Sequence, residues 1–483
     1  MLAPYHPNVV RIGMGYSQID SQFYSQCCMY LTFCGAAKIV SGSSYLVETK
    51  KVKFLVDCGI FQGEGLTDRN YESFLFNPKE IDYVFLTHAH LDHAGLIPRL
   101  LKEGFSGKII STPPTRDFYP LMLFDAQGIL EKEALSLGQQ PVYSRENIQK
   151  SIRHFKIFDY GKKIKLEGGI TFRFRDAGHI LGSAIIEVWV REEGKKNVKL
   201  VFSGDLGNPP VPLLRPTEFI EEADYVLVES TYGNVLHEDF KKRKYFFEDA
   251  IEETVCRGGV LMIPAFALER TQELLYEMSD LVKHRRIPEV PIFIDSPMAI
   301  KAIKIYKRHS RYFNKETAYL IESGKDIFNF PNLVFCKTKA QSKKINNIPP
   351  PKVIIAGSGM SQGGRILHHE IRYLPDPKSA LLMICYQIEG TLGREILDGA
   401  KEVKIFNEKV KVAAEVRFIK GYSAHADQEG LLRWVKKIKN KGPIKRIFAV
   451  QGEEKAARAL TQKIKDCLAV DAVVPDIGDK VEL

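Results

Sequence analysis

Three histidines and an aspartate fall within six consecutive residues of this chain, His88-Ala89-His90-Leu91-Asp92-His93. The whole sequence of 483 residues contains 12 histidines, so this density is far above chance. Imidazole nitrogens and carboxylate oxygens are the ligands that zinc prefers in proteins, together with thiolates. The spacing predicts that His88 and His90 bind one divalent ion, and that Asp92 and His93 bind a second ion beside it.

Three further candidate ligands stand apart in the sequence, each beside an apolar run: Asp57, His179 and Asp205. The histidine cluster itself follows the apolar run Tyr83–Thr87, which is typical of a buried strand. Taken alone, an aspartate after a strand is more often a turn residue or a helix cap than a metal ligand. Together with the cluster, the three residues predict one site built from the loops of several strands.

Five further motifs accompany these ligands: Leu31–Ala36, Glu229–Gly233, Pro264–Gln272, Gly357–Arg365 and Gly421–Ala426. With them, the chain from about residue 30 to its C-terminus resembles the metallo-β-lactamase fold, specifically the β-CASP family of RNA-processing nucleases. The histidine cluster alone would indicate only the superfamily, whose members also hydrolyse lactams, thioesters and lactones.

The resemblance implies a role for each candidate residue. His88, His90 and His179 would bind one zinc ion, Asp92 and His93 a second, Asp205 would bridge the two, and Asp57 would orient a ligand. Besides Asp92, the implied catalytic residues are Glu229 and His425. His425 would protonate the departing 3′ oxygen, and Glu229 would orient the imidazole of His425. The implied contacts to substrate are Ser358, Gly359 and Arg365, in a glycine-rich turn suited to phosphate.

The chain departs from the family pattern at Gln451, where a histidine is expected to complete the second zinc site. An amide oxygen is a harder and weaker donor for zinc than imidazole. Three outcomes follow: a weaker second site, a different metal there, or a protein that binds RNA while cutting it slowly or not at all. We expect two zinc ions, the second weakly held.

Phosphodiester hydrolysis explains why these residue types would be needed. Two metal ions about 3.5–4 Å apart can activate water and neutralise the charge on the attacked phosphate. The leading hypothesis is therefore a zinc-dependent RNA endonuclease, with 5′-exonuclease activity as a second mode. The alternatives are a catalytically weakened RNA-binding subunit, suggested by Gln451, and a thioester or lactone hydrolase, which the large middle segment disfavours.

The order of elements predicts an α/β protein in two units. Residues 29–234 and 421–483 would form the αββα metallo-β-lactamase sandwich, and residues 235–420 an inserted domain with a mostly parallel sheet, including a helix over 269–285. Residues 1–28 are polar and aperiodic, so a disordered extension is expected there. The substrate cleft would lie between the two domains.

Composition agrees with a cytoplasmic protein that binds a polyanion. The net charge is +10, and basic runs occur at 241–244, 284–286, 337–344 and 436–441. Such runs predict salt-sensitive binding of single-stranded RNA. The eight cysteines show no paired metal-ligand spacing, which fits free thiols, and no apolar run approaches the roughly 20 residues of a membrane span. A homodimer is the expected assembly if substrate choice depends on more than the cleft.

Overall fold

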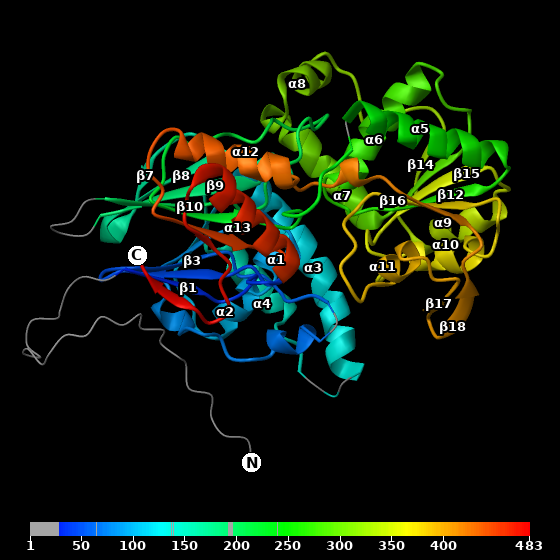
Figure 1. Cartoon of the computed structure of the whole chain (residues 1–483). Helices are drawn as coiled ribbons and strands as arrows, with labels where there is room; N and C mark the ends of the chain where they lie inside the picture. Colours follow the sequence, from blue (N-terminus) through cyan, green and yellow to red (C-terminus); the bar gives the residue numbers. More distant parts are fainter. Residues whose placement is uncertain (1–28, 64, 137, 139, 192–196, 239) are drawn as a thin grey trace, which may run out of the picture.

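The structure is a computed structural model that describes residues 29–63, 65–136, 138, 140–191, 197–238 and 240–483. The predicted N-terminal extension, residues 1–28, lies outside the described residues. Two units lie side by side (Figure 1). The larger contains the first and the last parts of the described chain, and the smaller is built from its middle.

Two seven-stranded sheets face each other in the larger unit. The first contains β1 (Tyr30–Phe33), β2 (Tyr45–Glu48), β3 (Lys53–Val56), β4 (Tyr83–Phe85), β5 (Lys108–Ser111), β6 (Phe155–Ile157) and, at the edge beside β1, β22 (Lys480–Glu482). The second contains β7 (Ile164–Lys165), β8 (Ile170–Asp176), β9 (Ala184–Val190), β10 (Val198–Phe202), β11 (Tyr225–Glu229), β20 (Arg446–Val450) and β21 (Ala472–Val473). Side chains from both sheets, including Phe54, Phe85, Phe172 and Phe448, pack into one buried cluster between them.

Helices cover the outer face of each sheet. On the first sheet lie α1 (Leu91–Ala94), α2 (Ile97–Lys102), α3 (Pro113–Ser136) and α4 (Arg145–Ile152); on the second lie α12 (Gln428–Lys439) and α13 (Glu454–Leu468). The sequence explains the packing of α12, because Leu431, Trp434, Val435 and Ile438 recur at helical spacing and are all buried. The layers are helix, sheet, sheet, helix.

The smaller unit is a six-stranded sheet in which every pairing is parallel. Its strands are β12 (Val260–Pro264), β13 (Ile292–Asp295), β14 (Leu333–Phe335), β15 (Lys352–Ala356), β16 (Ala380–Met383) and β19 (Glu415–Phe418). Its helices are α5 (Phe240–Cys256), α6 (Arg270–Lys283), α7 (Pro297–Arg308), α8 (Lys315–Glu322), α9 (Lys339–Lys344), α10 (Ile366–Tyr373) and α11 (Leu392–Leu397), and a hairpin, β17 (Glu402–Ile405) and β18 (Glu408–Lys411), projects from it. Central strands such as β12 are buried along their whole length, as a sheet covered on both faces requires.

The smaller unit is an insertion. The chain leaves the larger unit after β11 and returns with α12, followed by β20, which pairs in parallel directly beside β11. This arrangement confirms the predicted αββα sandwich with an inserted, mostly parallel α/β domain.

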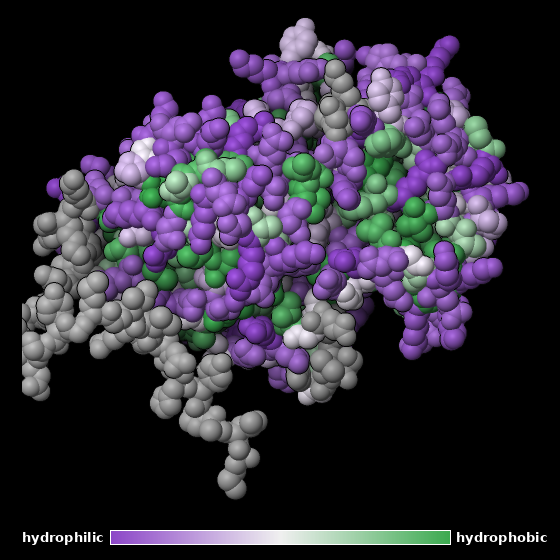
Figure 2. All heavy atoms as spheres, in the orientation of Figure 1, coloured by the Kyte–Doolittle hydropathy of each residue, from purple (hydrophilic) through white to green (hydrophobic). Residues whose placement is uncertain are grey.

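The strand ends place the predicted ligands. The parallel strands β3 and β4, and β10, β11 and β20 in the facing sheet, end at the edge of the sandwich that faces the insertion. Loops at the carboxyl ends of strands are where open α/β sheets bind ligands. The face seen in Figure 2 is mostly hydrophilic, with small groups of apolar side chains. None of the helices in the described ranges has the length and apolar character needed to cross a membrane.

Candidate metal centre and catalytic site

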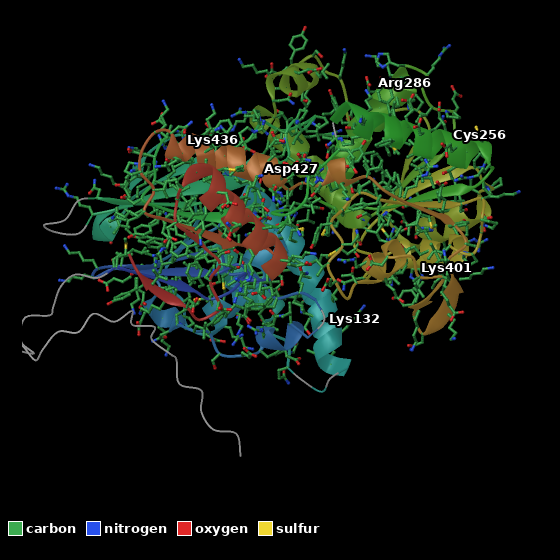
Figure 3. All side chains as sticks on the ribbon, in the orientation of Figure 1. Lys132, Cys256, Arg286, Lys401, Asp427 and Lys436 are labelled. Carbon is green, nitrogen blue, oxygen red and sulfur yellow. The ribbon has the colours of Figure 1, made fainter. Side chains whose placement is uncertain are left out.

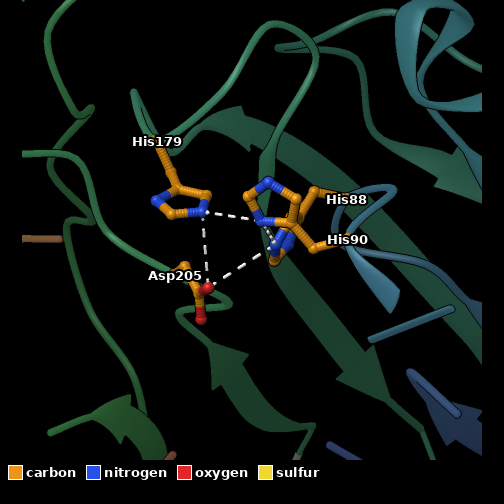
Figure 4. A group of neighbouring side chains, drawn as sticks. All are labelled: His88, His90, His179 and Asp205. Atoms are coloured by element: carbon orange, nitrogen blue, oxygen red, sulfur yellow. Dashed lines mark hydrogen bonds and ion pairs between the residues drawn. The ribbon is translucent and has the colours of Figure 1, made fainter. Parts of the chain in front are cut away.

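Four of the predicted ligands converge on one point, His88, His90, His179 and Asp205 (Figure 4), with one ligand atom from each lying within 4.8 Å of the others. The Nε2 atoms of His88 and His179 lie 3.5 and 3.4 Å from Asp205 Oδ2. His90 Nδ1 lies 3.0 Å from His88 Nε2 and 3.2 Å from His179 Nε2. One hydrogen on His90 Nδ1 cannot satisfy both nitrogens, whereas a cation would satisfy all four atoms. Three imidazoles and a carboxylate fit a tetrahedral zinc ion.

Contacts behind the imidazole rings fix their orientation. His179 Nδ1 lies 3.3 Å from the Ala424 carbonyl, which only accepts, so its Nε2 presents a lone pair to the centre. His88 Nδ1 lies 3.1 Å from the hydroxyl of Thr87. Burial lowers the pKa of His88 and His179 well below the usual range and lowers that of His90 to about 3. All three imidazoles are therefore neutral, which is the form that binds metal.

A second group contains Asp92, His93 and the shared Asp205. His93 Nε2 lies 3.6 Å from Asp92 Oδ2 and 3.3 Å from Asp205 Oδ1, and its Nδ1 lies 2.7 Å from Asp57 Oδ2. Burial lowers the pKa of His93, but the carboxylates of Asp205, Asp57 and Asp92 outweigh it and raise the pKa well above the usual range. This excess of negative charge in a buried pocket suits a cation. The structure also brings Gln451 here, with its Nε2 2.9 Å from Asp92 Oδ2.

Glu229 and His425 form a pair at the edge of the first group. His425 Nδ1 lies 3.0 Å from Glu229 Oε2 and 3.9 Å from Asp205 Oδ2. Burial lowers the pKa of His425, but the carboxylates of Glu229 and Asp205 outweigh it and raise the pKa to about 9. His237, to which the sequence assigned no role, holds the backbone here, since its Nε2 lies 3.0 Å from the His425 carbonyl.

The three predicted substrate contacts lie in the loop between β15 and α10. Arg365 donates from Nη1 to Asp295 Oδ1 at 2.6 Å and to the Cys336 carbonyl at 2.9 Å. This nitrogen therefore forms an internal ion pair, and Arg365 would have to break that pair to make a bidentate contact with phosphate. Ser358 Oγ accepts from the backbone N–H of Gln362 at 3.1 Å.

Gly359 packs closely against the insertion's other loops. A Cβ atom at Gly359 would lie 3.0 Å from both Cys385 Sγ and the Phe266 ring, so the loop tolerates no side chain without adjustment. The centroid of the Phe266 ring lies 6.5 Å from that of His90. The loop that contains Gly359 is thus separated from His90 by one aromatic side chain.

Two residues of the insertion, Glu269 and Arg270, bind the loops that carry His179 and His425. The backbone N–H of Leu181, two positions after His179, donates to Glu269 Oε2 at 3.2 Å. Arg270 Nη1 donates to the Tyr422 carbonyl, three positions before His425, at 2.6 Å. The sequence identified these residues as part of a motif and assigned them no role. Two adjacent opposite charges soon after an apolar strand are the feature of the sequence that could have indicated one.

The basic runs differ in exposure. Lys343, Lys344, Lys436 and Lys437 are exposed, and Lys436 extends from α12 in Figure 3. Arg243, a member of the run at 241–244 that was predicted to bind RNA, is instead buried, and its Nη2 lies 2.9 and 2.8 Å from Glu273 and Glu277. The prediction was wrong for Arg243 because helical spacing turns one residue of the run inward.

An αββα sandwich with clustered histidine and aspartate side chains at one edge defines the class as a metallo-β-lactamase-type protein. Residues 38–226 match the metallo-beta-lactamase superfamily, residues 271–396 the Beta-Casp domain, and residues 409–475 the Zn-dependent metallo-hydrolase RNA specificity domain.

Curated relatives match along most of the chain. It is 38% identical to Ribonuclease TTHA0252 of Thermus thermophilus over 88% of this chain and 94% of that protein. It is 33% identical to Transcription termination factor FttA of Methanosarcina mazei over 91% of this chain and 69% of that protein, and 32% identical to the RNase J-like protein of Methanocaldococcus jannaschii over 93% and 98%. The chain therefore belongs to the β-CASP family of the metallo-β-lactamase superfamily and is a metal-dependent hydrolase.

A solved structure shares the fold. The crystal structure of a protein of unknown function from Enterococcus faecalis covers 94% of this chain and 100% of its own, with a TM-score of 0.53 and 12% identity. At this identity the likeness extends to the fold alone.

Proposed function

We propose that this protein is a zinc-dependent ribonuclease that cuts single-stranded RNA internally, with 5′-exonuclease cleavage as a second mode. The observation that carries the proposal is the position of Asp205. Its carboxylate lies within 3.5 Å of the imidazoles of His88 and His179 and 3.9 Å from that of His425. Asp205 thus joins the proposed metal centre to the pair that would transfer the proton. The name of the Thermus relative, a ribonuclease, supports RNA as the substrate.

The residues divide the chemistry among them. His88, His90, His179 and Asp205 would hold a zinc ion, and Asp92 and His93 would hold a second ion with Asp205. Bound zinc supplies a Lewis acid that neutralises phosphate charge and brings the pKa of water from near 16 toward about 7. His425, oriented through Nδ1 by Glu229, is placed to donate a proton from Nε2 to the departing 3′ oxygen. The products would carry 5′-phosphate and 3′-hydroxyl ends.

The insertion would form the second wall of the substrate cleft. Its Glu269 and Arg270 contact the loops of His179 and His425, so RNA bound between the units would reach the centre directly. Exposed lysines on α9 and α12 would supply salt-sensitive attraction for the backbone. We further propose domain limits at 234/235 and 420/421 and a homodimer as the assembly. The protein would act in the cytoplasm, where the described free cysteines would stay reduced.

Cleavage of a 5′-labelled single-stranded RNA by the zinc-loaded full chain tests the proposal. We expect internal products that disappear with a chelator and return when zinc is restored. A ladder of single-nucleotide losses from the 5′ end would add the exonuclease mode. His425→Ala should slow cleavage by about 100- to 10,000-fold while zinc stays bound. Chelator-resistant cutting, or none by folded zinc-loaded protein, would refute it.

A second candidate is an RNA-binding subunit with little catalytic power, which the amide at Gln451 favours. This candidate predicts RNA binding of undiminished affinity together with cleavage that appears only in Gln451→His. Cleavage by the natural protein excludes it.

A further inference from the structure

Gln451 is fixed within the second group of ligands. It follows β20 with a positive φ of 50°, its backbone N–H donates to the Ala36 carbonyl at 2.7 Å, and its own carbonyl accepts from Thr231 Oγ1 at 3.0 Å. The side chain is 3% exposed. The backbone therefore directs the amide at Asp92 and His93 and leaves it little room to move.

Hydrogen bonding decides which end of the amide faces the ligands. Gln451 Nε2 lies 2.9 Å from Asp92 Oδ2 and 3.1 Å from the Val40 carbonyl. Both partners only accept, so the two amide hydrogens satisfy both. The reversed amide would place Oε1 against two acceptor oxygens, and the network therefore assigns the nitrogen to this position.

The amide nitrogen of Gln451 contacts the two side chains, Asp92 and His93, that a second ion would need as ligands. Gln451 Nε2 also lies 3.2 Å from His93 Nε2, the ring atom that faces the second position. An amide nitrogen has no lone pair to give to a metal, and here it is bonded to one of the required oxygens. A catalytic zinc ion has three protein ligands and one open position. The second group has three, but Asp205 is shared with the first group and Asp92 is bonded to the amide nitrogen. The donor set therefore fits zinc at the first group and fits it less well at the second.

We infer that this protein holds one zinc ion tightly at the His88, His90, His179 and Asp205 group, and that Gln451 makes the second position weak and exchangeable. A second ion binds only after the amide turns Oε1 toward it and leaves Asp92 and Val40. The shell would then contain two carboxylates, an amide oxygen and one imidazole, an oxygen-rich set that suits Mn²⁺ better than Zn²⁺. The inference rests on the metal centre of the proposed function and not on its substrate.

Metal stoichiometry tests this inference without reference to activity. The full chain is saturated with zinc and dialysed against metal-free buffer, and the retained metal is counted by native mass spectrometry and elemental analysis. We expect one zinc per chain for the natural protein and two for Gln451→His. Gln462→His, which adds a histidine on the exposed face of α13, is the matched control and should retain one. If Gln451→His fails to fold, Gln451→Glu supplies a carboxylate in its place and should likewise retain two.

Manganese provides a second readout. Electron paramagnetic resonance of the one-zinc protein should show Mn²⁺ binding at the second position about 10- to 100-fold more weakly in the natural protein than in Gln451→Glu, the size of loss expected when a ligand or its support is missing. Two zinc ions retained by the natural protein would overturn the inference and leave the ribonuclease proposal standing. One ion in the natural protein and in both Gln451 variants would also overturn it. One retained ion in a natural protein that cuts no RNA would support the inference and count against the proposed function.

Discussion

Arg243 stabilises the junction between the insertion and the segment that leads to His425. Its Nη2 pairs with Glu273 and Glu277 at 2.9 and 2.8 Å, and its Nη1 donates to the Gly421 carbonyl at 2.8 Å. Its guanidinium carbon lies 4.3 Å from the centroid of the Tyr422 ring. Replacing Arg243 with alanine would leave two buried carboxylates without this cation.

The cost of Arg243→Ala follows from burial. Breaking a buried ion pair by removing one partner costs about 3–5 kcal/mol, because the remaining charge stays buried. For a cooperative unit of 150–250 residues, each kcal/mol lowers Tm by about 2–4 °C, so a fall of about 6–20 °C is expected. Arg286 offers the control, since it pairs with a single carboxylate, that of Glu248, and its side chain is 40% exposed. Arg286→Ala should cost about 1 kcal/mol or less.

Thermal unfolding followed by circular dichroism, with both variants in the same metal state, measures the difference. Chemical unfolding in urea gives the free energy independently of the thermal scan. A Tm for Arg243→Ala no lower than that of Arg286→Ala would refute the reasoning that burial gives this network its strength. Zinc retention by Arg243→Ala should stay unchanged, because the metal ligands are held by other contacts.

Three further results are expected. Thr87→Val removes the hydroxyl that lies 3.1 Å from His88 Nδ1 and 2.8 Å from Asp57 Oδ2, and the affinity for the tightly held zinc, measured by chelator competition, should fall about 10- to 100-fold; unchanged affinity would contradict the orienting role of Thr87. Burial raises the pKa of Glu370 from 4.5 to about 7 despite its bond to Ser361, so folding stability should fall as pH rises through about 7. Between pH 5 and 8 the natural protein should lose about 3 kcal/mol of folding stability through Glu370, and Glu370→Gln should not show this loss. An equal slope of Tm against pH in the two proteins would contradict the assignment to Glu370. RNA affinity should fall by at least about tenfold between 50 and 200 mM salt, and a constant dissociation constant would argue against backbone contacts.

The local part of the site could be predicted from the sequence because its residues are close together in the chain. His88, His90, Asp92 and His93 share one loop and the start of one short helix, so their spacing alone brings them to one place. His179 and Asp205 required a further step, the rule that the ends of neighbouring strands meet at one edge of a sheet.

Other features depend on contacts that spacing does not contain. Arg243 is buried because it lies on the side of α5 that faces inward, whereas its neighbours Lys242 and Lys244 are exposed and partly exposed. Glu269 contacts the His179 loop only because the insertion folds back against the sandwich, and its φ of 65° excludes it from the helix predicted to begin there. The sequence identified Gln451 as the departure from the family, whereas only the folded structure shows the two acceptors, Asp92 Oδ2 and the Val40 carbonyl, that fix the orientation of its amide.

The rate of internal RNA cleavage by three zinc-treated proteins tests the central claim most directly: the natural chain, Asp205→Asn and His284→Ala. Asp205 joins both candidate ligand groups and the His425 pair, whereas His284 is an exposed histidine at the end of α6. We predict equal cleavage by the natural protein and His284→Ala, and loss of cleavage in Asp205→Asn with the fold intact. Undiminished cleavage by Asp205→Asn would contradict the assignment of the reaction to this centre.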